Sequence, residues 1–89
     1  MDEHSRRLVE MIKRAFNQFR SHEMSILDLA GTIEGIGAAL EVSAGGELIA
    51  ALNSLVGKLE HIHFMCQPEE QREKVLGEIA RVEEILCKS

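Results

Sequence analysis

The sequence predicts an all-α protein, an antiparallel up-and-down four-helix bundle in which residues 1–89 form a single domain. Among the 89 residues only three are aromatic, all of them Phe, and only one is Pro. Sheets favour aromatic and β-branched residues, whereas Leu, Glu, Ala and Arg, which abound here, favour helices. Apolar residues also recur at helical spacing in four successive stretches, and short linkers of about two to six residues make successive helices antiparallel neighbours.

The first predicted helix extends from Asp2 to about His22 and is amphipathic. Its apolar residues share one stripe, and most of its basic residues lie off that stripe. Asp2 and Glu3 at its start and Arg20 near its end suit the helix dipole. The apolar stripe consists of Leu8, Ile12, Ala15, Phe16 and Phe19.

The second predicted helix begins at Ser25, which forms with Asp28 a Ser-x-x-Asp pattern resembling a capping box. Its apolar seam repeats at spacings of 3, 4, 3 and 4 residues, as in helices that pack on other helices. The seam consists of Ile26, Leu29, Ile33, Ile36 and Leu40. The segment Glu41–Gly46 ends this helix because its paired glycines suit a turn between helices.

Small residues occupy one side of the second helix, and two interpretations of them remain open. Gly31, Gly35 and Ala38 lie three to four residues apart, where small side chains let another backbone approach closely. They either pack closely inside the bundle or form a flat surface, poor in side chains, on which a partner docks. Gly37 and Gly57 are further glycines inside predicted helices, each costing about 0.8–1 kcal/mol relative to alanine.

The third predicted helix begins near Glu47, and Pro68 ends it and starts the fourth, since proline suits the first position of a helix. The third carries the apolar residues Leu48, Leu52, Leu55, Leu59, Ile62 and Cys66. The fourth extends to Lys88 and carries Val75, Leu76, Ile79, Val82, Ile85 and Leu86. We expect the centre of the core to consist of Leu29, Ile33, Leu52, Leu55, Leu59 and Ile79.

Charge is unevenly distributed along the chain, whose formal net charge is −5. Residues 1–22 carry +2, residues 67–89 carry −2, and residues 23–66 carry −5 with Lys58 as their one basic residue. The acidic middle argues against binding to nucleic acid or to an anionic membrane and favours a basic protein partner. No apolar stretch approaches the ~18 residues that cross a bilayer, and the N-terminus lacks the signal-peptide pattern, so we expect a cytoplasmic protein.

The segment Glu60–Cys66 holds the one cluster of candidate metal ligands, with Glu60, His63 and Cys66 on successive helical turns. A packed cysteine and a hydrogen-bonded histidine explain this cluster, so we expect no metal site and no cofactor. Cys66 and His63 lack a third orienting group for nucleophilic catalysis, and the glycines lack the Lys-Ser/Thr of a P-loop. We therefore expect a protein that is not an enzyme and has no catalytic residue.

The stretch Ser25–Glu41, SILDLAGTIEGIGAALE, together with Leu59–Ile62, resembles the middle of small all-helical bacterial immunity proteins. In such families a cytosolic protein neutralises a cognate toxin domain, often a nuclease of a contact-dependent or polymorphic toxin system. The resemblance implies binding and inhibition without any chemistry of its own. It also implies that the partner-binding residues, which would mimic the phosphates of nucleic acid in a basic nuclease cleft, are Asp28, Glu34, Glu41 and Glu60.

The function that the sequence predicts is that of a small acidic protein-binding module, most specifically an immunity-type inhibitor of a basic toxin domain. One alternative is a helical adaptor or regulatory protein that binds an amphipathic helix of its partner in a groove. Another is a structural homo-oligomer whose exposed stripe residues pair with a second copy, so that monomer and homodimer both remain open.

Overall fold

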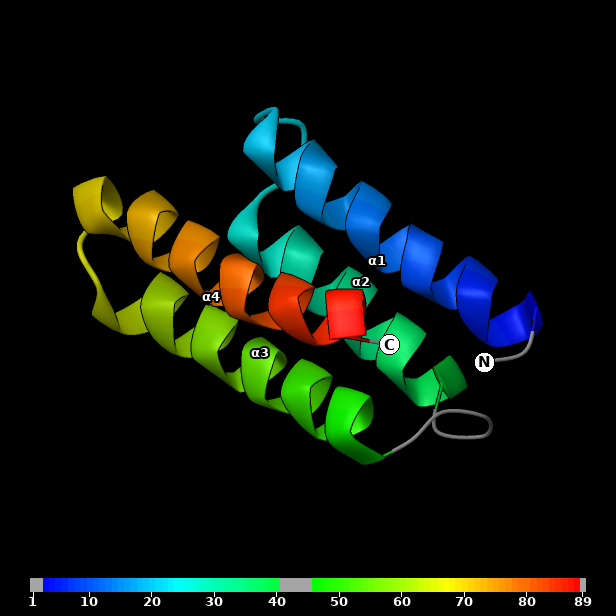
Figure 1. The fold of residues 1–89 in the computed structure, drawn as a ribbon. Coiled ribbons are helices and arrows are strands. Elements are labelled where there is room, and N and C mark those ends of the chain that lie inside the picture. The colour runs from blue at the N-terminus through cyan, green and yellow to red at the C-terminus, as the bar shows by residue number, and fades with distance from the viewer. Residues whose placement is uncertain (1–2, 41–45, 89) are drawn as a thin grey trace.

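The computed structural model describes residues 3–40 and 46–88 (Figure 1). Within these ranges the regular secondary structure is entirely helical, with no strand. The elements are α1 (Glu3–Arg20), α2 (Ile26–Leu40), α3 (Gly46–Met65) and α4 (Pro68–Lys88). The all-α prediction is confirmed, and the predicted helix ends agree with the observed ones to within about two residues. The predicted turn over residues 41–45 lies outside the described residues.

Helices that follow one another in the chain pack side by side, and α1 makes a smaller contact with α4. The body measures 39 × 22 × 21 Å. A helix of 21 residues, such as α4, is about 31 Å long at 1.5 Å per residue, so the body is little longer than one helix. Within the described residues, no helix is both long and apolar enough to cross a membrane.

The apolar stripes of all four helices meet in one core. All six residues expected at its centre are at most 2% exposed, and so is Phe16, the largest of the fully buried side chains. The first predicted stripe is also buried along its whole length, from Leu8 to Phe19. Removing apolar surface from water contributes about 25 cal/mol per Å², which makes this shared core the main source of stability. The predicted core is therefore confirmed.

The C-terminal end of α1 is closed by backbone hydrogen bonds around His22. The N–H of His22 donates to the carbonyl of Phe19 at 3.1 Å, and the N–H of Glu23 donates to that of Gln18 at 2.9 Å. These two bonds define a Schellman motif, in which the residue at the position of His22 adopts a left-handed conformation. His22 has a φ of 64°, a region that glycine enters more easily because it lacks a Cβ.

The first turns of α4 hold the C-terminal ends of two other helices. Gln71 Nε2 donates to the carbonyls of His63 and Cys66, at the end of α3, at 3.1 and 3.0 Å. Arg72 donates to the carbonyls of Phe19, at 3.2 Å, and Arg20, at 2.6 Å, at the end of α1, and its guanidinium lies 5.3 Å from the centre of the Phe19 ring. The last carbonyls of a helix have no partner in a following turn, so these side chains supply donors there. The carbonyl of Phe19 accepts from Arg72 in addition to the N–H of His22.

A second arginine joins α1 to α4. Arg20 forms a two-pronged pair with Glu83, in which its Nη1 donates to Oε2 at 2.9 Å and its Nη2 donates to Oε1. This hydrogen bonding raises the pKa of the Arg20 guanidinium above its ordinary value, burial opposes the rise, and the charge of Glu83 adds to it. The pair is partly exposed, so it orients α1 on α4 more than it stabilises the fold.

The starts of α2 and α4 match the predicted start signals. The Oγ of Ser25 accepts a hydrogen bond from the backbone N–H of Asp28 at 3.1 Å, which is the bond that an N-cap serine makes. Pro68 is the first residue of α4, and the carbonyl of Gln67 before it accepts from the N–H of Glu70 at 2.9 Å. Local sequence therefore decides where these helices begin.

Replacing Leu55 by alanine should lower the free energy of unfolding by about 2–5 kcal/mol, because it leaves a cavity at a position that is 2% exposed. Urea denaturation followed by circular dichroism measures the loss. Leu27→Ala is the matched control, since Leu27 is 44% exposed and its loss should stay near 0.5 kcal/mol. Equal losses in the two variants would contradict the assigned core.

Replacing His22 by glycine should raise the free energy of unfolding by about 0.5–1 kcal/mol, because glycine adopts the left-handed conformation without strain. Thermal unfolding monitored by circular dichroism measures the gain. His22→Ala retains the Cβ and should leave the melting temperature close to that of the wild type. A destabilised glycine variant would show that the His22 side chain has a stabilising role of its own.

Replacing Arg72 by methionine should lower the free energy of unfolding by about 1–3 kcal/mol, since two carbonyls of α1 lose a charged donor. Hydrogen exchange of the α1 amides should accelerate most near Phe19 and Arg20. Arg81→Met, a change of the same kind at an exposed position of α4, is the control. Uniform acceleration across all four helices in Arg72→Met would argue against a local role at the end of α1.

Candidate functional site

The side of α2 that points away from the core carries almost no bulky side chains. We call this surface the α2 outer face, and it consists of Leu27, Asp28, Gly31, Glu34, Gly35 and Ala38, all of them exposed. It faces outward because the seam from Leu29 to Leu40 on the opposite side is buried. One apolar side chain, two carboxylates and a row of small residues therefore form an accessible helical surface.

The glycines of α2 divide into two kinds. A Cβ built on Gly31 or Gly35 would meet nothing within 4 Å, so close packing inside the bundle is the wrong interpretation of these two residues. Gly37, by contrast, is buried, and a Cβ there would lie 3.9 Å from the Cβ of Leu52 on α3. Helical periodicity places Gly37 on the core side because it falls one turn before the buried Leu40 and one turn after Ile33.

Three of the four acidic residues predicted to bind a partner lie on the surface. Asp28 and Glu34 lie on the α2 outer face, where positions six residues apart are about 120° apart around the helix, one on either flank of the small-residue row. Glu60 is exposed on α3, and Glu41 lies outside the described residues. None of the three forms an ion pair with any residue that the structure describes.

The carboxylates of Asp28 and Glu34 have no basic partner from residues 23–66, because Lys58 points toward α4. Lys58, the one basic residue of positions 23–66, has its Nζ 3.1 Å from Oε2 of Glu78 on α4. Its cation therefore serves the contact between α3 and α4, and Asp28 and Glu34 have no cation of their own segment beside them. The acidic side chains of α2 remain available to a basic partner.

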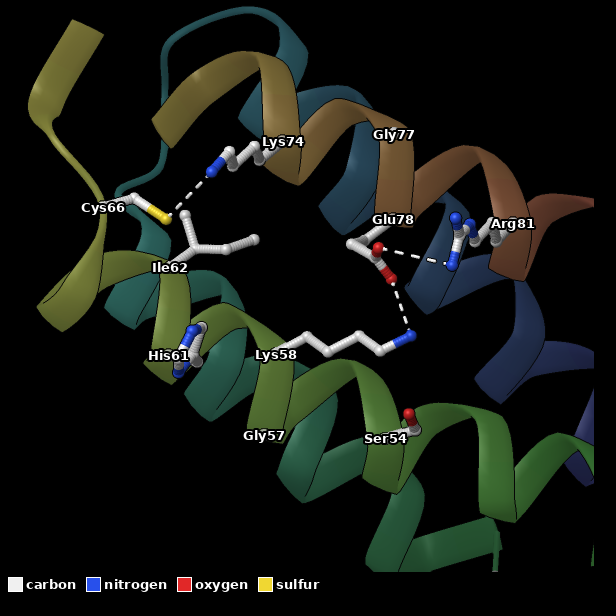
Figure 2. A pocket seen from close by; sticks show the side chains of 10 residues that line it. All are labelled: Ser54, Gly57, Lys58, His61, Ile62, Cys66, Lys74, Gly77, Glu78 and Arg81. Atoms are coloured by element: carbon white, nitrogen blue, oxygen red, sulfur yellow. Dashed lines mark hydrogen bonds and ion pairs between the residues drawn. The ribbon is translucent and has the colours of Figure 1, made fainter. Parts of the chain in front are cut away.

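A groove that the sequence reasoning missed runs between α3 and α4. It encloses about 650 Å³, and the residues that line it come from Ser54–Cys66 on α3 and Lys74–Arg81 on α4 (Figure 2). Gly57 and Gly77 lie on its two sides, and a Cβ on either would meet nothing within 4 Å. The signal for it in the sequence is that two successive helices each carry a glycine within one helical turn of a basic residue, Lys58 next to Gly57 and Lys74 and Arg81 on either side of Gly77.

Basic side chains outnumber acidic ones in this groove. Glu78 forms an ion pair with Lys58 through one carboxylate oxygen, and its other oxygen lies 3.7 Å from Arg81 Nη1, as the dashed lines of Figure 2 mark. Lys74 is the third cation; its Nζ lies 3.4 Å from Cys66 Sγ and 3.8 Å from Oε2 of Glu70, which does not line the groove. Three cations and one carboxylate therefore line a groove on an acidic protein.

The cluster of candidate metal ligands on α3 is not brought together with others. His63 is half-buried and packs edge-on against Phe64, with ring centres 4.8 Å apart. Cys66 is free and half-buried beside Lys74. Among the described residues, no three His, Cys, Asp or Glu side chains lie close enough together to hold a metal ion.

Comparison with known proteins adds no family to this description. The sequence matches no protein-family model, and neither a curated protein nor a solved structure is significantly similar to it. The resemblance to immunity proteins therefore rests on the stretch Ser25–Glu41 and on Leu59–Ile62 alone.

Proposed function

We propose that the chain is a small acidic protein-binding module, and most specifically an immunity-type inhibitor that binds and neutralises a basic toxin domain such as a nuclease. Its binding surface is the α2 outer face, extended by Glu60 of α3. The observation that carries the proposal is that Asp28, Glu34 and Glu60 are exposed and form no ion pair within the described part of the chain.

The α2 outer face suits a protein partner on physical grounds. Glycine and alanine at 31, 35 and 38 let another backbone approach α2 closely, and a helix held by a buried seam is a rigid platform for its side chains. Carboxylates on both flanks would steer a basic partner and set its orientation. Leu27, 44% exposed, offers an apolar contact at one end of the same surface.

The same proposal includes the topology of the helical bundle and the cellular compartment in which the protein acts. We take the four helices as an antiparallel up-and-down bundle, because consecutive helices pack side by side and α1 also contacts α4. The protein acts in the cytoplasm by occupying its partner, without a catalytic residue, metal or cofactor. Its effect on the partner is steric and electrostatic.

The test is a charge reversal on the proposed surface with a matched reversal elsewhere. The variant Asp28→Lys/Glu34→Lys/Glu60→Lys and the control Glu69→Lys/Glu73→Lys/Glu84→Lys change the net charge equally, and Asp28 and Glu69 both lie in the first turn of a helix. Both proteins serve as bait for affinity capture from the native cells, followed by affinity measurement and an activity assay on any captured protein.

We expect the first variant to bind its partner at least about tenfold more weakly than the control and to lose inhibition, because opposite charge speeds association and fixes orientation. Raising the salt concentration should narrow the difference between the two. Equal binding by both variants, with affinity independent of salt, would contradict the proposal. Circular dichroism of both variants verifies that the fold is retained.

A further inference from the structure

The groove between α3 and α4 has the size of a small-molecule site. Its volume of about 650 Å³ lies within the range of about 300–1,000 Å³ that is usual for such sites. Its lining residues belong to two helices that are held together by the buried core and by the Lys58–Glu78 pair (Figure 2). The packing of α3 on α4 therefore forms the groove.

Packing does not explain the two glycines that open this groove. A glycine inside a helix costs about 0.8–1 kcal/mol relative to alanine, and Gly57 and Gly77 each lie inside one. Because a Cβ on either would meet nothing within 4 Å, alanine would fit both positions without strain. What the missing side chains provide is space between the helices and direct access to the backbone.

The charge of the lining selects the sign of an occupant. Lys58, Lys74 and Arg81 line the groove together with one carboxylate, that of Glu78, on a protein whose formal net charge is −5. Arg81 is the most exposed of the three, since 72% of its side chain is exposed against 52% for Lys74 and 46% for Lys58. An anion would find its counter-charge here and repulsion over the acidic α2 outer face.

The lining also limits the apolar part of an occupant. Ile62 is its one large hydrophobic residue, supplemented by the methylene stems of the lysines. The four exposed large hydrophobic residues of the described chain, Met11, Leu27, Phe64 and Met65, do not line the groove. Docking of a partner helix needs several apolar anchor positions, which this groove does not offer, whereas a short hydrocarbon chain needs only one apolar wall.

We propose that the groove between α3 and α4 binds a small anionic amphiphile, a carboxylate or phosphate monoester with a short apolar chain. The anionic group pairs with Arg81 and Lys58, and the apolar chain lies along Ile62 between Gly57 and Gly77. This site is separate from the α2 outer face and does not depend on the function proposed for that surface.

The experiment is a nuclear magnetic resonance titration of the ¹⁵N-labelled full chain with three probes of equal chain length. Heptanoate and hexyl phosphate carry the two anionic groups on a hexyl chain, and hexyltrimethylammonium carries a cation on the same chain. We expect at least one anion to cause saturable shifts of the Gly57 and Gly77 amide signals. That anion should bind at least about tenfold more tightly than the cation, and added salt should lower its affinity. The preferred anion identifies the head group.

Matched glycine variants test the location. Gly57→Leu and Gly77→Leu fill the groove, whereas Gly35→Leu makes the same change on the α2 outer face, and all three side chains start in open space. We expect each groove variant to bind the preferred anion at least about tenfold more weakly than the wild type does, and Gly35→Leu to bind it with unchanged affinity. Arg81→Gln should weaken it about threefold or more without loss of fold, which thermal melts of every variant verify.

Several results would overturn the proposal. They include shifts of equal size with the cation and the anions, no saturable binding of either anion, full binding in both groove variants, and an equal loss in Gly35→Leu. Tighter binding of an acidic helical peptide than of either anion, abolished by Gly77→Leu, would also overturn it in favour of a partner's helix. None of these results involves the basic protein partner proposed for the α2 outer face.

Discussion

The structure depends on burying four apolar stripes in one core. Each helix has a single stripe, and together the stripes enclose Phe16, Leu29, Leu59 and Ile79, all of them fully buried. Turning these stripes inward fixes the rotation of every helix about its own axis, because residues three and four apart share a face. The core therefore also decides which residues face outward, and the small and acidic residues of α2 become a surface for this reason.

The helix ends are the second constraint, and α4 satisfies much of it. Gln71 and Arg72, neighbours in its first turns, donate to the terminal carbonyls of α3 and α1 respectively. The contact of α1 with α4 is smaller than its contact with α2. The Arg72 bonds and the Arg20–Glu83 pair therefore orient α1 on the side where it is less packed. An unsatisfied carbonyl costs more than a hydrogen bond gains, so these polar contacts matter beyond their number.

The molecule presents two surfaces of opposite charge, and the position of Lys58 contributes to the difference between them. Its cation pairs with Glu78 across the α3–α4 contact, which leaves the carboxylates of α2 without a basic neighbour from their own segment and adds positive charge to the groove. A protein with a net charge of −5 thus carries both the acidic α2 outer face and a groove lined mainly by cations. Each surface suits an occupant of opposite charge, and neither competes with the other for space on the same helix face.

The amino-acid sequence by itself determined the four helices, their ends and the residues of the core, because helix periodicity, the Ser25 cap and Pro68 act within a few residues of the chain. The resemblance of residues 25–41 and 59–62 to immunity proteins also implied Asp28, Glu34, Glu41 and Glu60 as binding residues, of which Asp28, Glu34 and Glu60 are exposed and Glu41 lies outside the described residues. Only the tertiary structure decided that no neighbouring helix covers Gly31 and Gly35 while α3 packs on Gly37 through Leu52, since periodicity tells which residues share a face but not which partner covers that face. The contacts of Arg72 with residues 52 and 53 positions earlier, and the groove beside Gly57 and Gly77, likewise arise from helices meeting in space, which no local pattern encodes.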